Sequence, residues 1–218
     1  MLLKDAIINR QSIRHYKEGD VADSDILEMI SYASKAPSAK NVQNWHFLVI
    51  KSREVIVKIA DLIIEKGNSL SDKMESKGDN TAQVFRKFIL NFGTFFLRAP
   101  VLVLVYTSIN IPNRSNELNY LDYDEENYDL IFKRDPAMIS VGAAIENFIL
   151  TANSLGYGTC LISAHTYAIR EIEKLIRKEI NFEKEGYFLG PMFSLGIPEY
   201  NSKSPIKKPL EEIYTIIK

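Results

Sequence analysis

Four short runs of apolar, β-prone residues are spread along this 218-residue chain, and they limit the folds open to it. Each run is long enough for a strand and too short for a buried helix. Segments with helical spacing separate the runs, and the chain begins with two helical patterns before its first strand. This order predicts an α+β fold with a mixed central β-sheet flanked by helices. The predicted strands cover residues 45–50, 101–107, 159–163 and 187–195.

Apolar residues at helical spacing indicate the helices. Pro37 ends the pattern that begins near residue 23, and Gly67 is the expected stop of the pattern over residues 56–64. Residues 85–96 predict an unusually aromatic helix. Further helices are predicted over residues 2–7, 138–155 and 169–176.

Two polar segments have no steady period. Residues 68–81 predict a mobile loop, and residues 109–135, rich in Asn, Tyr and acidic side chains, predict a long loop with at most one helical turn. A loop of that length in a compact domain usually has a function or a partner. No repeat or linker divides the chain, so we predict one domain over residues 1–218.

The composition excludes several classes of protein. Lysine and arginine total 27 against 28 for aspartate and glutamate. A net charge of −1 lacks the excess of basic residues that binding to nucleic acid or to an anionic membrane requires. One cysteine, Cys160, excludes an internal disulfide and fits a reducing compartment. The apolar residues 95–107 are interrupted by Arg98 and Pro100, far short of the ~20 residues of a membrane helix. Since Lys4 comes too early for a secretory signal, we predict a cytoplasmic protein.

Common catalytic signatures are missing from the sequence. The three histidines, His15, His46 and His165, have no metal-ligand spacing, so no metal site is predicted. There is no Gly-x-Ser-x-Gly elbow and no phosphate-binding P-loop string. Residues 156–158 begin like a dinucleotide fingerprint, but Leu161 takes the place of the third glycine, and the run lies between a helix and a strand. A dedicated nicotinamide-binding domain is therefore not expected.

The string Arg10–Arg14 places two guanidiniums and the Ser12 hydroxyl where a helical pattern stops. Such groups give a phosphate charge-assisted hydrogen bonds, each worth roughly 1.5–3 kcal/mol. On this string alone, solvated surface charges are the more frequent explanation.

A second string, Pro37–Trp45, joins a helix end to a strand through Ser38, Asn41 and Gln43. Amide side chains offer both donors and acceptors to the edge of a flat heterocycle. The alternative is an ordinary connection in which these side chains satisfy turn backbone.

Together these strings resemble the FMN-dependent nitroreductase family. The residues 10–16 match its opening Arg-x-Ser-x-Arg-x-[Tyr/Phe], and residues 36–47 are similar to its second block. Residues 143–152, 155–160 and 195–198 followed by 207–212 are similar to its central helix, the strand after it and its C-terminal signature, in the expected order. The resemblance covers nearly the whole chain and implies the family's three-layer fold.

The resemblance also implies FMN as cofactor and a role for each matching residue. Arg10 and Ser12 would bind the phosphate, Gln11 would contribute mainly backbone, and Arg14 would lie at the pyrimidine edge as the catalytic, electrostatic group. The family builds its sites from two subunits, so the second block would reach FMN across a homodimer interface. The remaining cofactor-binding residues implied are Pro37, Ser38, Asn41, Gln43, Leu161, Ile162, Ser163 and Lys207, with Lys208 as the alternative to Lys207.

Two positions depart from the family pattern. Gln11 replaces a frequent arginine and removes one charge, and Asn44 replaces the common proline, which we expect to leave that loop less rigid. We expect the segments 85–96 and 120–128 to shape the substrate side. Within them Phe88, Phe92, Phe95 and Tyr123 are candidates to stack on aromatic substrates, although core packing is the more frequent role of any one of them.

The function implied is ping-pong transfer of hydride from NADH or NADPH to a nitroaromatic or quinone acceptor. The alternatives left open are reductive dehalogenation, flavin breakdown, and a non-catalytic flavin-binding regulatory dimer. Cys160 is expected to be an inert core thiol. His165 is expected to be structural, with proton delivery to substrate as the alternative.

Overall fold

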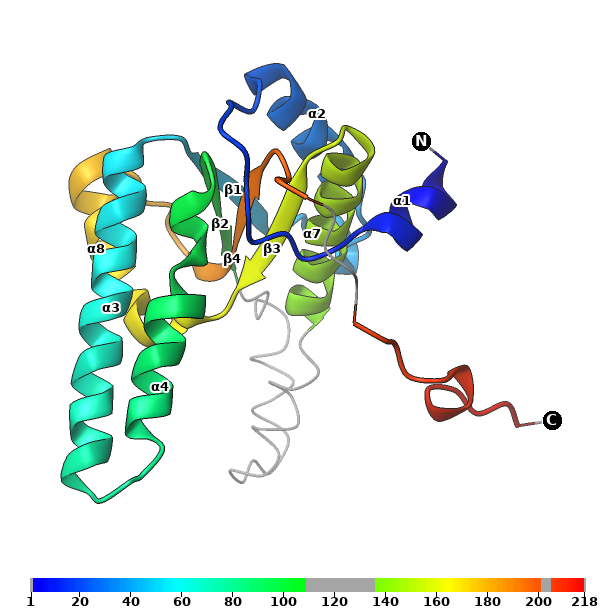
Figure 1. The fold of residues 1–218 in the computed structure, drawn as a ribbon. Coiled ribbons are helices and arrows are strands. Elements are labelled where there is room, and N and C mark those ends of the chain that lie inside the picture. The colour runs from blue at the N-terminus through cyan, green and yellow to red at the C-terminus, as the bar shows by residue number, and fades with distance from the viewer. Residues whose placement is uncertain (1, 109–135, 201–204, 218) are drawn as a thin grey trace, which may run out of the picture.

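A four-stranded antiparallel sheet forms the centre of the molecule, with the strand order β1-β2-β4-β3 (Figure 1). The computed structural model describes residues 2–108, 136–200 and 205–217. The strands are β1 (Trp45–Ile50), β2 (Val101–Thr107), β3 (Gly158–Ile162) and β4 (Phe188–Gly196), each within one residue of its predicted bounds. The sheet is not mixed as expected, because every pairing among these strands is antiparallel. In the described part of the chain, parallel pairing is limited to an isolated bridge between Ser12 and Thr159.

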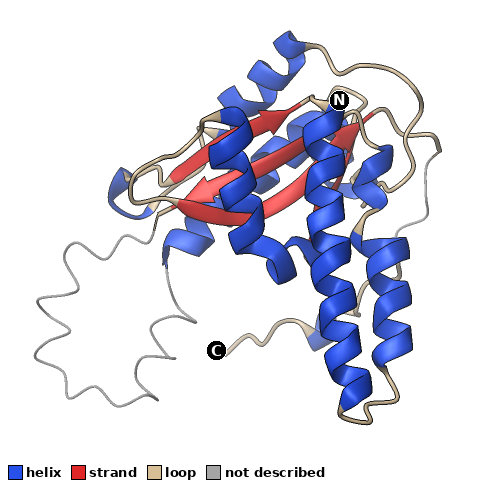
Figure 2. Cartoon of the chain, turned by 90° about the vertical axis from the view of Figure 1, so that its left-hand side faces the viewer, coloured by secondary structure: helices blue, strands red, loops and turns tan. Residues whose placement is uncertain are grey.

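The central strand β2 shows how the layers form. Its side chains alternate between the two faces of the sheet, and all of them are buried. Leu102 and Leu104 pack in one core cluster, and Val103 and Val105 pack in the other. The first cluster is closed by α3 (Arg53–Ser76) and α8 (Ile169–Ile180), and the second by α2 (Asp23–Ala33) and α7 (Pro136–Ser154) (Figure 2). The predicted α+β class and the three layers are confirmed.

The long helix α3 corrects the prediction that Gly67 ends a helix. The helix continues to Ser76 and pairs with α4 (Ala82–Phe88) in a hairpin that projects from the body (Figure 1). A Cβ at Gly67 would lie 2.7 Å from Cγ2 of Ile89, so this glycine permits close packing rather than a helix end. The predicted mobile loop 68–81 is therefore wrong for residues 68–76. Helix–helix burial outweighed the weak local preference of glycine for a stop.

The aromatic stretch after α4 is not one helix as predicted. A π-helical turn over Ile89–Gly93 and a 3-10 turn over Phe95–Arg98 interrupt it. Phe95 is buried, while Phe88 and Phe92 are 41% and 60% exposed with their ring centroids 6.2 Å apart. The predicted loop 109–135 and its Tyr123 lie outside the described residues.

The two chain ends leave apolar side chains uncovered. In Figure 1 the short helix α1 (Leu3–Asn9) and the C-terminal segment 205–217 both extend away from the sheet. All residues of that C-terminal segment are exposed. The exposed apolar side chains at the two ends include Leu2, Leu3, Ile7, Ile8, Leu210, Ile213, Tyr214, Ile216 and Ile217. None of the helices in the described ranges combines the length and apolarity needed to cross a membrane.

Gly67→Ala tests the packing of the hairpin. Alanine gains about 1 kcal/mol of helix propensity, but the close contact with Ile89 costs about 1–3 kcal/mol when the core cannot adjust. We expect a net loss of about 1 kcal/mol in the free energy of unfolding, measured by urea denaturation at fixed protein concentration. The control is Gly142→Ala in α7, where nothing lies within 4 Å of the added carbon. Equal stabilisation by both substitutions would contradict the close packing.

Candidate functional site

The residues after α1 form an extended arm, residues 10–17, that lies beside β3. Ser12 makes a parallel bridge with Thr159, and the following N–H donates to the Thr159 carbonyl at 2.9 Å. Two further backbone hydrogen bonds, of 2.9 and 3.1 Å, join residues 15–17 to residues 197–199 beyond β4. The arm is therefore held at both ends by the sheet.

The inward side of the arm depends on a glycine of β3. Ile13 is 6% exposed, and a Cβ at Gly158 would lie only 2.6 Å from its Cγ1 atom. Gly158 therefore permits the arm to approach β3 closely. Because side chains alternate along extended backbone, Ser12 and Arg14 lie on the opposite, exposed side of the arm. The predicted run of cation, hydroxyl and cation is thus presented along one edge of the sheet.

The arginines of the arm have no acidic partners in the part of the chain that the structure describes. Among the described residues, no carboxylate forms an ion pair with Arg10 or Arg14. The Arg14 guanidinium carbon lies 5.6 Å from the ring centroid of Phe95. A cavity of about 130 Å³ beside it is lined by Ser12, Ile13, Arg14, His15 and Tyr200. Uncompensated cations next to a hydroxyl favour binding of an anion.

Cys160 lies in β3 behind this cluster and is 3% exposed. Burial raises the pKa of its thiol, and the nearby Arg14, a Ser12 hydrogen bond and Arg10 offset that rise only in part. The thiol is therefore protonated and shielded at neutral pH. The predicted core position of this thiol is confirmed, and its inertness stays a prediction.

The second predicted string forms a tight loop between α2 and β1. The Gln43 N–H donates to Ser38 Oγ at 3.0 Å, and the Gln43 amide donates to Asn41 Oδ1 at 3.3 Å. Asn41 and Gln43 have positive φ and exposed side chains, and Pro37 is exposed. Within the described residues, no hydrogen bond connects this loop to the arm. One chain alone does not bring the two strings together.

Asn44 corrects the prediction of a less rigid loop. Its side chain is 2% exposed, and its amide donates to Thr107 Oγ1 at 3.0 Å, to the Ser108 carbonyl at 3.1 Å and to the Ala137 carbonyl at 3.3 Å. Thr107 Oγ1 donates back to the Asn44 carbonyl at 2.8 Å. The asparagine thus ties the loop to β2 and α7 through bonds that a proline could not make. No local sequence pattern indicates these distant partners.

The end of β3 presents the third group of candidates. Leu161 is 55% exposed, Ile162 is buried, and Ser163 is exposed just after the strand. The alternation places Leu161 and Ser163 on the open face of the sheet edge and Ile162 in the core.

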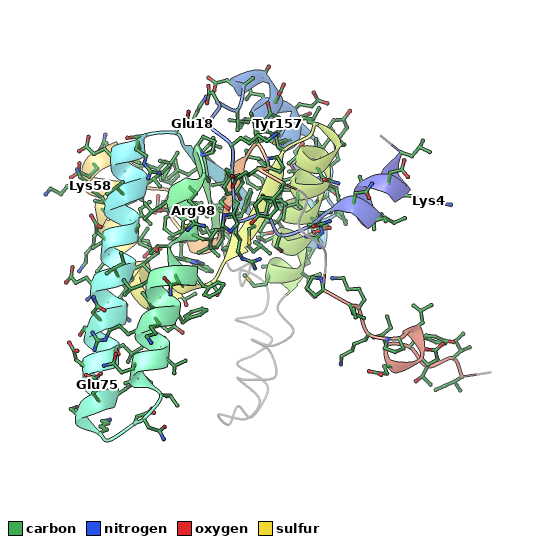
Figure 3. The ribbon with its side chains drawn as sticks, viewed as in Figure 1. Lys4, Glu18, Lys58, Glu75, Arg98 and Tyr157 are labelled. Carbon is green, nitrogen blue, oxygen red and sulfur yellow. The ribbon has the colours of Figure 1, made fainter. Side chains whose placement is uncertain are left out.

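The two candidate lysines lie elsewhere. Lys207 and Lys208 are exposed on the C-terminal segment that leaves the body (Figure 1). Figure 3 shows this segment running away from the sheet, with its side chains spread around the backbone. The single chain therefore does not bring these lysines to Arg10 and Ser12.

His165 is packed behind β3 and is 4% exposed. Its Nε2 atom lies 2.9 Å from the Gly190 carbonyl oxygen. Burial lowers the pKa of the ring, so the side chain is neutral at pH 7. This contact with β4 supports the structural role expected for His165.

The family model of the nitroreductase family matches residues 7–196. The chain belongs to the nitroreductase family. The match includes the arm, the loop after α2 and all four strands, and it confirms the resemblance drawn from the sequence.

Nitroreductase-family structures and relatives extend this comparison. A BluB-like flavoprotein from Clostridium difficile 630 is 51% identical over the whole of both chains, with a TM-score of 0.94. A nitroreductase with bound FMN from Desulfitobacterium hafniense has a TM-score of 0.72 and 18% identity over all of both chains. Iodotyrosine deiodinase of Hydra vulgaris is 27% identical over 94% of this chain and 68% of its own length. An NADH dehydrogenase/NAD(P)H nitroreductase of Archaeoglobus fulgidus is 42% identical over 25% of this chain, and the match spans only 32% of that relative.

Asn44→Ala tests the anchoring of the loop. The substitution removes the hydrogen bonds that the Asn44 amide donates to the buried Thr107 hydroxyl and to the Ser108 and Ala137 carbonyls, and loss of a hydrogen bond at a buried site costs about 1–3 kcal/mol. We expect the free energy of unfolding to fall by about 2–4 kcal/mol. Asn41→Ala, at an exposed position of the same loop, is the matched control and should change it by less than about 0.5 kcal/mol. Equal stabilities for the two variants would contradict the anchoring role.

Proposed function

We propose that this chain binds FMN and works as a homodimeric oxidoreductase, passing electrons from NADH or NADPH to nitroaromatic or quinone-type acceptors. The observation that carries the proposal is the arm itself, where Arg10, Ser12 and Arg14 lie together and the described residues supply no carboxylate partner. Membership of the nitroreductase family supports the same conclusion.

The donors on the arm fit an FMN phosphate. A phosphate monoester carries nearly two negative charges, and Arg10 and Ser12 offer a cation and a hydroxyl two residues apart. Gln11 adds a different feature, because its Oε1 atom is buried and has no hydrogen-bond partner in the described residues. Because side chains alternate along the arm, this side chain lies on the inward side with Ile13 and not on the outward side with Ser12 and Arg14. We therefore propose that Gln11 contacts the cofactor through its backbone.

Arg14 is the proposed catalytic group. Bound FMN supplies the redox chemistry, since its ring accepts a hydride and then releases electrons to the acceptor. Reduction places negative charge on the pyrimidine edge of the ring, and a cation fixed there stabilises the reduced form more than the oxidised form. The Arg14 guanidinium is exposed, lies 5.6 Å from the Phe95 ring centroid and forms no ion pair within the described part of the chain, so it is available for this role.

A second copy of the chain would complete the site. The cavity of about 130 Å³ beside Arg14 is smaller than the ~300–1,000 Å³ typical of a cofactor site. Ser38, Asn41 and Lys207 belong to segments that do not meet the arm within one chain. The apolar side chains left exposed on α1 and on the C-terminal segment favour burial against another protomer. We propose that the partner supplies the loop and the lysines.

Reductive dehalogenation is the second candidate. It is favoured by the similarity to an iodotyrosine deiodinase over 94% of this chain. To separate the candidates, the anaerobically reduced protein is mixed with menadione, 4-nitrobenzoate and 3-iodotyrosine, and flavin reoxidation is followed by absorbance. Our proposal expects fast reoxidation by the first two and bleaching of the flavin by NADH or NADPH. Selective reoxidation by the iodinated substrate, with release of iodide, would favour the second candidate.

FMN binding is the direct test of the proposal. We expect purified protein to be yellow and to hold about one FMN per protomer. Loss of a charge-assisted contact worth roughly 1.5–3 kcal/mol should weaken FMN binding about 10- to 150-fold in Arg10→Ala, measured by flavin fluorescence. Arg177→Ala removes another exposed arginine, one paired with Glu183, and should leave the affinity unchanged. A wild-type protein that stays colourless with added FMN would refute the proposed function.

Arg14→Ala tests the electrostatic role. Because the lost cation favours the reduced flavin, we expect the midpoint potential of bound FMN to fall. Arg14→Lys keeps the charge, so the midpoint potential of its bound FMN should stay close to that of wild type. The potentials are measured by spectroelectrochemical titration. An unchanged potential in Arg14→Ala would remove Arg14 from the catalytic assignment.

A further inference from the structure

Beneath the arm, a buried pair of hydroxyls faces the backbone between Ser12 and Arg14. Tyr16 is 9% exposed, and its hydroxyl lies 2.6 Å from the Ile13 carbonyl oxygen and 2.7 Å from Ser194 Oγ. Ser194, on β4, is 0% exposed. The hydroxyl pair thus connects the centre of the sheet to the arm through two short hydrogen bonds.

The direction of these hydrogen bonds follows from the atoms involved. A carbonyl oxygen can only accept, so the Tyr16 hydroxyl must use its single proton to donate to Ile13. Ser194 then donates to the Tyr16 oxygen at 2.7 Å, in preference to the Cys160 carbonyl at 3.4 Å. Burial also raises the pKa of Tyr16, so it remains a proton donor throughout the physiological range. The chain of donors runs from Ser194 through Tyr16 to the arm.

The Ile13 carbonyl belongs to the same peptide unit as the Arg14 N–H. A hydrogen bond donated to the oxygen polarises the amide and makes its N–H a stronger donor. Within the described residues, no hydrogen bond from the Arg14 N–H to the protein is present. Arg14 also lines the small cavity beside Ser12. The strengthened donor is therefore available to a ligand at the proposed site.

We propose that Tyr16 is a positioning residue of the cofactor site: with Ser194 behind it, its hydroxyl holds the Ile13–Arg14 peptide in place and strengthens the donor that this peptide offers to FMN. This inference rests on the proposed function, because it needs the arm to contact FMN. It predicts that the hydroxyl, and not only the aromatic ring, matters for the cofactor. The hydroxyl stabilises the reduced flavin more than the oxidised flavin, because the reduced form carries more negative charge.

Tyr16→Phe tests the inference because it deletes one oxygen and keeps the ring. We expect the Kd for FMN to rise about 5- to 10-fold, because the variant loses the hydrogen bond to the Ile13 carbonyl and leaves that buried oxygen unpaired. The affinity for reduced FMN should fall further than that for oxidised FMN, so the midpoint potential should also fall. Ser194→Ala removes only the second donor and should change both quantities in the same direction, about 2- to 3-fold in Kd.

Tyr157→Phe is the matched control. It deletes the same atom and a comparable hydrogen bond, since the Tyr157 hydroxyl donates to Asp25 Oδ2 at 2.7 Å, but it does not face the arm's backbone. We expect it to lower the melting temperature while leaving the Kd and the potential of bound FMN within the error of wild type. That contrast separates positioning of the cofactor from general stability.

Two results would overturn the inference. One is a Tyr16→Phe variant that melts earlier, like Tyr157→Phe, yet binds FMN with wild-type affinity and potential. If Tyr16→Phe does not fold, unchanged affinity and potential in Ser194→Ala would have the same meaning. Failure of the wild-type protein to bind FMN is distinguishable from both, because it contradicts the proposed function rather than the role of Tyr16.

Discussion

The close contact between the arm and β3 is the constraint on which the proposed site depends. Ile13 occupies the space that any side chain at position 158 would fill, and the backbone of the arm pairs with Thr159. Burial of Ile13 turns the arm so that its polar residues face outward. A hydrophobic contact therefore determines where the Ser12 hydroxyl and the Arg14 guanidinium lie. The arm has no such order in isolation, because an extended segment needs a paired edge to hold it.

The electrostatics of the site follow from what surrounds the arm. Elsewhere on the surface, several arginines and lysines have acidic partners, as Arg86 does with Asp72 and Lys58 with Glu179. The arm instead lies against the apolar edge formed by Phe95 and Cys160, which supply no carboxylate. Across residues 2–108, 136–200 and 205–217, its cations therefore have no carboxylate partner. A site of this kind favours a dianion over neutral ligands before any specific contact forms.

Much of the fold could be predicted from the sequence, because strand runs such as 101–107 are set by local apolar content that burial on both faces requires. The arm could also be identified as a group of phosphate donors. The errors arose where distant contacts outweighed local preference. Gly67 has the local character of a helix stop, yet it lies mid-helix because Ile89 packs against it. Asn44 is rigid through partners more than 60 residues away in sequence. Neither contact leaves a periodic signal.

The distribution of the candidate residues links cofactor binding to assembly. Arg10, Ser12 and Arg14 lie on the arm. Ser38 lies in the loop after α2, and Lys207 lies on the C-terminal segment that extends away from the sheet. If the partner's segments complete the site, FMN contacts two chains at once and binds the dimer better than the monomer. A ligand with that preference stabilises the dimer by mass action. The exposed apolar residues of α1 and the C-terminal segment then serve the cofactor as well as the interface, since burying them brings the two halves of the site together.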